Sequence, residues 1–213
     1  PIGFKIEAAP LHPGMASILL GGHGERLMAR FQQYPHTQMM LSLMRDGFHP
    51  ESAGGKVRIH LDGSPVLDYP LTDYVLEGFR RSLLAMAEIQ FAAGARTVRP
   101  FHEQSDDYRT WASAKEAIAR FDMKPLLTGA GSAHVMGGCG MAASEKQGVV
   151  RPDGVHWQLE NLSVHDGSVF PTSIGANPQV SIYGLVSKLA TALADRLAPT
   201  GAFLPSATAV RFV

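Results

Sequence analysis

The sequence predicts an α+β fold in which helices pack against an antiparallel sheet. In residues 55–69, apolar and polar side chains alternate on either side of a turn at Asp62-Gly63, which is typical of a β-hairpin. In residues 72–95, apolar side chains recur at spacings of three and four, which is typical of a long amphipathic helix. A hairpin beside long helices indicates the α+β class.

The residues before the hairpin predict an extended piece, an interrupted helix and a strand. Residues 3–8 read as a short extended segment in a start rich in proline and glycine. Residues 15–34 are helix-like at both ends, but three glycines between positions 21 and 24 weaken the middle. Residues 37–46 carry a Met-rich apolar run, and we expect a strand there because the hairpin follows it.

The long helix has recognisable signals at both ends. Thr72 or Asp73 can cap its N-terminus, and Gly94 can end it in a left-handed conformation. A short strand is expected at residues 95–101 and a second helix at residues 113–121. The apolar stripe that should face the core comprises Val75, Phe79, Leu83, Met86 and Ile89.

The last part of the chain is irregular up to a final helix. Residues 123–143 are rich in glycine and show no periodicity, and residues 160–171 contain a strand-like Leu-Ser-Val followed by a turn. The final helix is expected at residues 178–198. Asn177 suits its N-cap and Pro178 suits its first position. The predicted core-facing stripe comprises Val180, Leu185, Leu189 and Leu193.

Composition excludes several classes of protein. The 213 residues carry 19 basic and 19 acidic side chains, so nothing indicates bulk attraction to nucleic acid. One cysteine, Cys139, excludes an internal disulfide framework. No apolar run is long enough for a transmembrane segment and no signal peptide is visible, so we expect a soluble and cytoplasmic rather than secreted protein. The nine histidines show no paired metal spacing, and no metal site is expected.

Two short features near Cys139 have competing interpretations. The Gly138-x-Gly140-x-x-Ala143 pattern lacks the strand and helix that a dinucleotide fingerprint requires, so we reject that interpretation. Cys139 is read as a small buried apolar residue rather than a nucleophile. His134 lies in an apolar, glycine-rich stretch, where partial desolvation would keep its imidazole neutral and available as a base. A structural histidine is the alternative.

The Asn177-Pro178 pair also allows two interpretations. A plain helix cap explains both residues. The same geometry leaves free backbone N–H groups and the positive end of a helix dipole, which can hold an anion or developing negative charge.

These residues together resemble the C-terminal signature of the glucose-methanol-choline (GMC) flavin oxidoreductases. The dense match covers residues 132–197, and residues 55–95 resemble more loosely the strand-strand-helix passage of the family's substrate domain. Gly138 and Gly140 stand where family members commonly have Thr and Arg, and Arg151 stands where an acidic residue is frequent. The residues that carry the resemblance are His134, Cys139, Asn161-Leu162, Asp166-x-Ser168, Pro171 and Asn177-Pro178.

The resemblance implies an alcohol oxidase or dehydrogenase that uses FAD. His134 would accept the hydroxyl proton of the alcohol substrate, or hydrogen-bond its oxygen, while hydride passes to the flavin. Asn177 would contact the same oxygen. The cofactor contacts that the resemblance implies are Asp166, Gly167, Pro178 and Gln179.

The resemblance also implies a division of the chain and a missing partner. Residues 1–131 would be part of the substrate-binding domain, residues 132–198 the C-terminal segment of the FAD domain, a strand-loop-helix unit, and residues 199–213 a tail. Most of the FAD site would lie in an N-terminal part that this chain lacks, so we expect the isolated chain to be inactive. A non-redox member similar to hydroxynitrile lyases, or a cofactor-free binding or structural module, remains the alternative.

Overall fold

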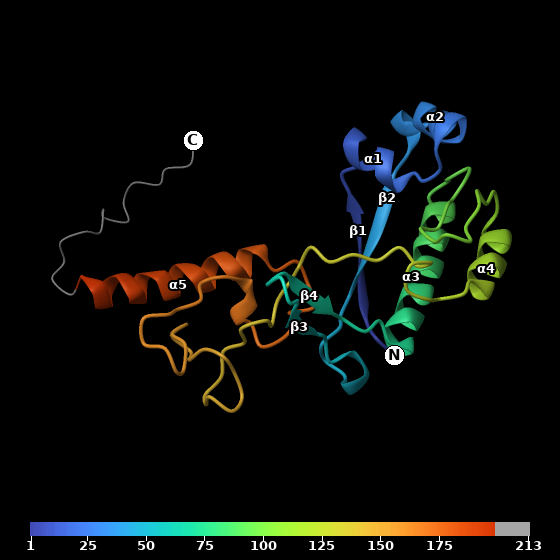
Figure 1. The fold of residues 1–213 in the computed structure, drawn as a ribbon. Coiled ribbons are helices and arrows are strands. Elements are labelled where there is room, and N and C mark those ends of the chain that lie inside the picture. Colours follow the sequence, from blue (N-terminus) through green and yellow to red (C-terminus); the bar gives the residue numbers. More distant parts are fainter. Residues whose placement is uncertain (199–213) are drawn as a thin grey trace, which may run out of the picture. The chain divides into compact units, whose positions relative to one another are not determined.

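The computed structural model describes residues 1–198, so the tail predicted at residues 199–213 lies outside the described residues. The chain divides into two compact units, Pro1–Ser132 and Ala133–Val213. Among residues 1–198, the first unit contains strands β1–β4 and helices α1–α4, and the second contains α5 (Figure 1). The combination of helices and small antiparallel sheets confirms the α+β class.

The first sheet joins segments that are far apart in the sequence. Strand β1 (Phe4–Ala9) pairs antiparallel with β2 (Met39–Met44), with Phe4 opposite Met44 and Ala9 opposite Met39. The chain between them forms α1 (Pro13–Leu19), α2 (Gly24–Gln32) and the 3₁₀ turn η1 (Tyr34–His36). The expected helix is therefore interrupted where its glycines lie, and the expected strands at both ends are confirmed.

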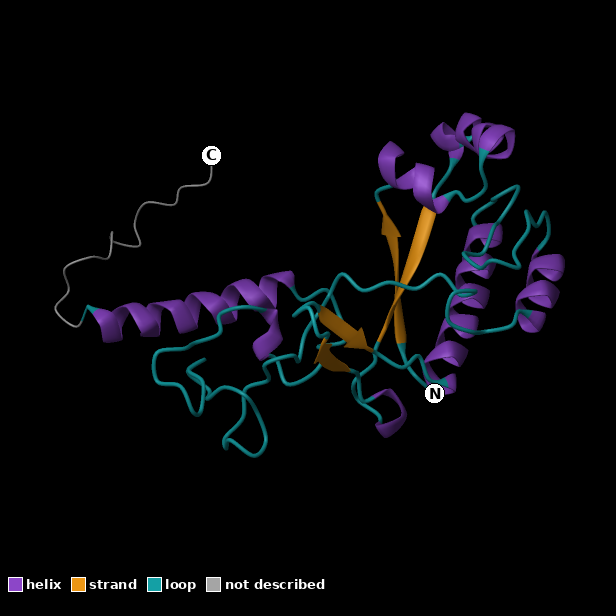
Figure 2. Ribbon diagram, viewed as in Figure 1, coloured by secondary structure: helices purple, strands orange, loops and turns teal. Residues whose placement is uncertain are grey.

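The hairpin forms a second sheet of its own. Strand β3 (Lys56–Ile59) pairs antiparallel with β4 (Pro65–Asp68), after the 3₁₀ turn η2 (Pro50–Ser52). The antiparallel pairing agrees with the prediction, and the strands form two separate pairs (Figure 2). Alternation of apolar and polar residues predicts a strand, but it does not predict which strand will pair with it. Much of the hairpin's apolar surface is exposed. Its exposed apolar residues are Val57, Ile59, Leu61 and Leu67.

Helix α3 (Asp73–Ala92) organises the first unit. Thr72 occupies the N-cap, but its hydroxyl donates to the Glu51 carbonyl (2.5 Å) instead of capping the helix. At the other end Gly94 adopts a left-handed φ of 91°, and the N–H groups of Gly94 and Ala95 donate to Phe91 and Gln90. This is the Schellman arrangement, which confirms the role predicted for Gly94.

The core of the first unit lies between α3 and α4 (Trp111–Arg120). Thr110 caps α4 by accepting a hydrogen bond from the Ser113 N–H (3.2 Å). The predicted strand at residues 95–101 is wrong, because only one bridge forms there, from Val98 to Tyr108. Ile89, expected in the stripe of α3, is 45% exposed. The buried cluster comprises Leu83, Ala87, Val98, Ala114, Ile118 and Phe121.

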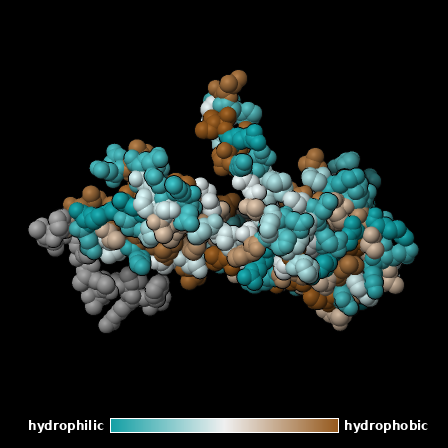
Figure 3. Space-filling view, turned by 90° about the horizontal axis from the view of Figure 1, so that it is seen from below, coloured by the Kyte–Doolittle hydropathy of each residue, from teal (hydrophilic) through white to brown (hydrophobic). Residues whose placement is uncertain are grey.

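The second unit is an irregular loop assembly packed against α5 (Gln179–Leu197). The strand expected near residue 162 is reduced to isolated bridges, such as Val155 with Ser163, and no named strand lies within residues 133–198. The helix packs with Leu185 and Leu189 as expected, whereas Val180 is 82% exposed. The buried cluster comprises Val150, Val169 and Leu189. In this view of the molecule, apolar residues reach the surface in patches between polar ones (Figure 3).

Candidate active site

The stretch that follows His134 runs alongside the stretch that follows Asp166. The Cys139 N–H donates to the Ser168 carbonyl (2.9 Å), and the Met141 N–H donates to the Val169 carbonyl (2.8 Å). Val169 is fully buried and belongs to the cluster against which Met141 packs. Backbone hydrogen bonds therefore hold the two glycine-containing stretches of the predicted site together.

Gly167 joins three segments of the predicted site. A β-carbon placed on Gly167 would lie 2.8 Å from Ile182 Cδ1 on α5 and 3.3 Å from the Val135 carbonyl oxygen. The residue after His134 and the first turn of α5 thus meet at this glycine. The sequence interpretation assigned the small size of Gly167 to contact with a cofactor. On the side where a β-carbon would stand, packing within the protein also leaves little room for one.

The structure places the two predicted catalytic residues at the edges of this junction. His134 is half-buried, and Asn177 is exposed beside a buried Pro178. Helix α5 begins at Gln179 with Pro178 at the N-cap, so the predicted cap at Asn177 and helix start at Pro178 are each one residue early. The first turn of α5 closes with a hydrogen bond from the Ile182 N–H to the Pro178 carbonyl (2.8 Å).

Asp166 has a local structural role. Its Oδ1 accepts hydrogen bonds from the Ser168 N–H (2.8 Å) and the Ser168 hydroxyl (2.5 Å). These bonds cap the 3₁₀ turn η3 (Gly167–Val169) and hold the pKa of Asp166 below its usual value, because they favour the ionised form. The carboxylate therefore stays negative and orients the turn that contains Gly167.

The N-terminal end of α5 keeps a positive electrostatic character. Its first turn contains no acidic side chain, and Pro178 at the N-cap contributes no side-chain hydrogen bond. The Gln179 side-chain amide donates to the Tyr183 hydroxyl (2.5 Å), one turn further along the helix. A group bound at this helix end would therefore meet the Gln179 backbone rather than its amide.

Sequence reasoning missed the residues that connect the site. Val135 and Ile182 belong to no motif, and only the folded chain brings both against Gly167. Near the C-terminal end of α5, the Nη1 of Arg196 donates a hydrogen bond to Asp153 (3.2 Å), which connects the helix to the loops of the second unit. An Arg–Asp pairing of this kind carries no signal in the sequence, because the two residues lie in different segments.

A separate hollow of about 540 Å³ lies in the first unit. It is lined mainly by the start of α3 and residues 121–125, including Asp73, Glu77 and Arg80. None of the predicted site residues lines it. Its lining is rich in charged side chains, and the Nη1 of Arg80 donates a hydrogen bond to the Ile118 carbonyl (2.7 Å).

Two kinds of feature are absent from the described residues 1–198. No group of three or more His, Cys, Asp or Glu side chains gathers there in an arrangement that could hold a metal ion. None of the helices in this part of the chain has the length and apolar character needed to span a membrane.

Comparisons with known proteins converge on one family. A family model described as GMC oxidoreductase matches residues 50–185, more than half of the chain. The long-chain-alcohol oxidase FAO4A of Arabidopsis thaliana is 31% identical over 84% of this chain and 25% of its own length. The corresponding figures for long-chain-alcohol oxidase FAO4B of the same plant are 28%, 82% and 24%. A cholesterol oxidase of Acinetobacter baumannii is 40% identical over 30% of this chain and 10% of its own.

Proposed function

Because this chain belongs to the GMC oxidoreductase family, we propose that it supplies the C-terminal catalytic segment of an FAD-dependent alcohol oxidase or dehydrogenase. Its relatives include proteins named as alcohol oxidases, which supports alcohol oxidoreductase chemistry. The chain spans about a quarter of the length of these relatives. The observation that carries the proposal is the junction at Gly167, where the residue after His134 meets the first turn of α5.

The proposed substrate is a long-chain alcohol. The two relatives that support this choice are named long-chain-alcohol oxidases and match more than four fifths of this chain. The match to the cholesterol oxidase covers only 30% of this chain. It therefore supports alcohol oxidation in general rather than a sterol substrate. The Met-rich run does not add to this argument, because in β2 it pairs with β1 as an ordinary part of the first unit.

His134 is proposed to move the proton. The alcohol O–H proton passes to a neutral imidazole nitrogen of His134, and the carbon–oxygen bond gains double-bond character as hydride leaves the same carbon. When bound, FAD supplies the acceptor for that hydride. Asn177 cannot act as the base, but its amide can donate a hydrogen bond to the substrate oxygen as negative charge develops there.

The residues present fit an electron-accepting ring at the end of α5. The helix dipole is positive at Gln179, and its first turn has no acidic side chain that would oppose a reduced, negatively charged ring. The carboxylate of Asp166 accepts a hydrogen bond from the Ser168 N–H within its own turn. We propose backbone contacts from Pro178 and Gln179 to the ring, and from Asp166 and Gly167 to the cofactor's chain.

The proposal includes an N-terminal FAD-binding part of the same protein as partner. Apolar residues of the β3–β4 hairpin remain exposed in this chain, which is consistent with a surface that another part of the protein covers. We expect the isolated chain to lose FAD on desalting. Flavin absorbance that stays with the isolated chain would contradict this part of the proposal.

The test is His134→Ala in the complete enzyme. Loss of the general base should lower the rate of alcohol-dependent flavin reduction by about 10²–10⁴-fold. His23→Ala is a matched control, because His23 is exposed and makes no side-chain cap bond to α2. Near-normal reduction in His134→Ala would refute the base assignment. If the wild-type flavin is not reduced by any alcohol, a non-redox role similar to that of hydroxynitrile lyases is favoured instead.

A further inference from the structure

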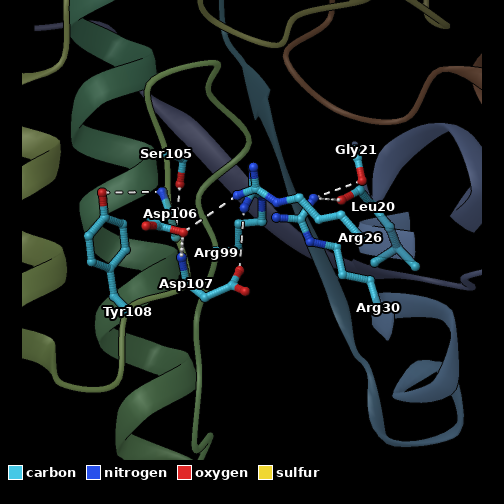
Figure 4. Close-up of polar contacts among 9 residues, drawn as sticks. All are labelled: Leu20, Gly21, Arg26, Arg30, Arg99, Ser105, Asp106, Asp107 and Tyr108. Atoms are coloured by element: carbon cyan, nitrogen blue, oxygen red, sulfur yellow. Dashed lines mark hydrogen bonds and ion pairs between the residues drawn. The ribbon is translucent and has the colours of Figure 1, made fainter. Parts of the chain in front are cut away.

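Three arginine side chains come together in the first unit, at a distance in sequence from every residue of the proposed active site. Arg26 and Arg30 lie on α2, and Arg99 lies on the segment that follows α3. Figure 4 shows their guanidinium groups gathered beside the turn that carries Asp106 and Asp107. We call these three arginines and two aspartates the arginine cluster.

Arg30 has a donor that the protein does not use. Its Nη1 donates to the Leu20 carbonyl (2.9 Å) and to the Gly21 carbonyl (2.7 Å), which ties α2 to the end of α1. Its Nη2 is shielded from solvent and has no hydrogen-bond partner. A shielded guanidinium nitrogen without an acceptor is unfavourable, because neither water nor protein replaces its hydration.

The two carboxylates only partly neutralise the cluster. Arg26 lies 3.7 Å from Asp106, and Arg99 lies 3.4 Å from Asp107, both longer than a strong charge-assisted hydrogen bond. Asp106 Oδ1 also accepts the Asp107 backbone N–H (2.9 Å), which uses part of its capacity. Three positive and two negative side chains leave an excess of one positive charge.

The electrostatics agree with this geometry. The pKa of Arg30 is lowered by burial and by repulsion from Arg99 and, to a smaller extent, Arg26, while Asp107 and Asp106 act in the opposite direction. The arginines therefore destabilise one another, and a further negative group among them would relieve that repulsion.

We propose that the arginine cluster binds a phosphate group, held by the guanidinium groups of Arg26, Arg30 and Arg99. A phosphate monoanion matches the excess of one positive charge, and its oxygens can meet more guanidinium forks at once than the two oxygens of one more carboxylate. It supplies the acceptor that Arg30 Nη2 lacks. Alcohol oxidation at His134 needs no such group, so the site goes beyond the proposed function.

Two sources share this chemistry: free phosphate and the phosphate headgroup of a lipid. The helices beside the cluster also expose three large apolar side chains, which would suit a lipid surface. These are Met15, Ile18 and Met28. The experiment therefore has one arm for each source.

In the first arm, inorganic phosphate is titrated into the full chain by isothermal calorimetry. Saturable binding is expected, and Arg99→Gln should weaken it about tenfold or more, as for the loss of a charge-assisted hydrogen bond. Asp107→Asn should tighten binding, because it removes a competing carboxylate, and a misfolded variant could not imitate that gain. Arg58→Gln is the control, since Arg58 pairs with Asp68 on the separate β3–β4 hairpin and should not matter.

In the second arm, the same variants are sedimented with phosphatidylcholine vesicles, with and without phosphatidic acid. Binding that requires phosphatidic acid and is lost in Arg99→Gln, without a response to inorganic phosphate, assigns the site to a lipid headgroup. A response in both arms supports a general phosphate site. The proposal is overturned if neither probe binds, or if Arg58→Gln weakens binding as much as Arg99→Gln does.

Discussion

Replacing Gly167 with alanine tests whether the junction of the segments of the proposed active site depends on close packing. The added methyl carbon would stand 2.8 Å from Ile182 Cδ1, whereas carbon atoms in favourable contact lie about 3.5–4.0 Å apart. The Val135 carbonyl oxygen, 3.3 Å away, limits movement in another direction. Overpacking costs about 1–3 kcal/mol, and we expect the free energy of unfolding of the second unit to fall by about 1 kcal/mol, because Cδ1 is the end of a side chain that can turn.

A second substitution isolates the cause. Ile182→Val removes the Cδ1 atom that the new methyl group would strike, at a cost of about 0.5–1.5 kcal/mol by itself. In this background Gly167→Ala should cost clearly less, so the two substitutions should couple favourably by about 0.5–3 kcal/mol, the range for residues in contact.

The assay is urea unfolding followed by tryptophan fluorescence. The chain has two tryptophans, and a Trp111→Phe background leaves Trp157 as the reporter of the second unit. Gly184→Ala is the control, because a β-carbon there meets no atom within 4 Å and alanine should stabilise the helix by about 0.5–1 kcal/mol. An equal cost of Gly167→Ala with and without Ile182→Val would refute the packing argument.

Three other substitutions probe single features of the fold. Ile118→Ala should destabilise the first unit by about 2–5 kcal/mol in urea unfolding, because Ile118 is fully buried. The control Ile18→Ala, at a site that is 77% exposed, should change the stability little. Similar losses of stability at both sites would contradict the prediction. Gly94→Ala should lower stability by about 1–2 kcal/mol in thermal unfolding, since its φ of 91° is costly for alanine, and an unchanged melting temperature would contradict this. Asp166→Asn should destabilise near neutral pH, and the deficit should disappear in acid as the pH falls through the lowered pKa of Asp166, whereas a deficit independent of pH would exclude its charge as the cause.

The helices followed closely from local patterns. The apolar periodicity of residues 72–95 predicted α3 and its left-handed end at Gly94, and the glycines near residue 22 predicted a weak point where the chain breaks between α1 and α2. Such features are readable because the interactions that form a helix lie within one turn of each residue.

The errors concern contacts with other parts of the chain. Val180 fits an apolar stripe by spacing, yet it lies in the first turn of α5 and is exposed. Residues 95–101 suit a strand by composition, but only Val98 finds a bridging partner, at Tyr108. Propensity describes what a segment can form, whereas burial and pairing depend on which neighbour is present.

By itself, the sequence determined the family, the helices, the hairpin and the residue types of the proposed site, because these depend on local periodicity and on motif spacing. Only the tertiary structure decided that Gly167 would meet Val135 and Ile182, and that arginines of two segments would converge around the unused donor of Arg30. The physical reason is that a one-dimensional pattern records which face of an element is apolar or charged. Which faces meet is decided by packing and charge acting between segments that are distant in the chain.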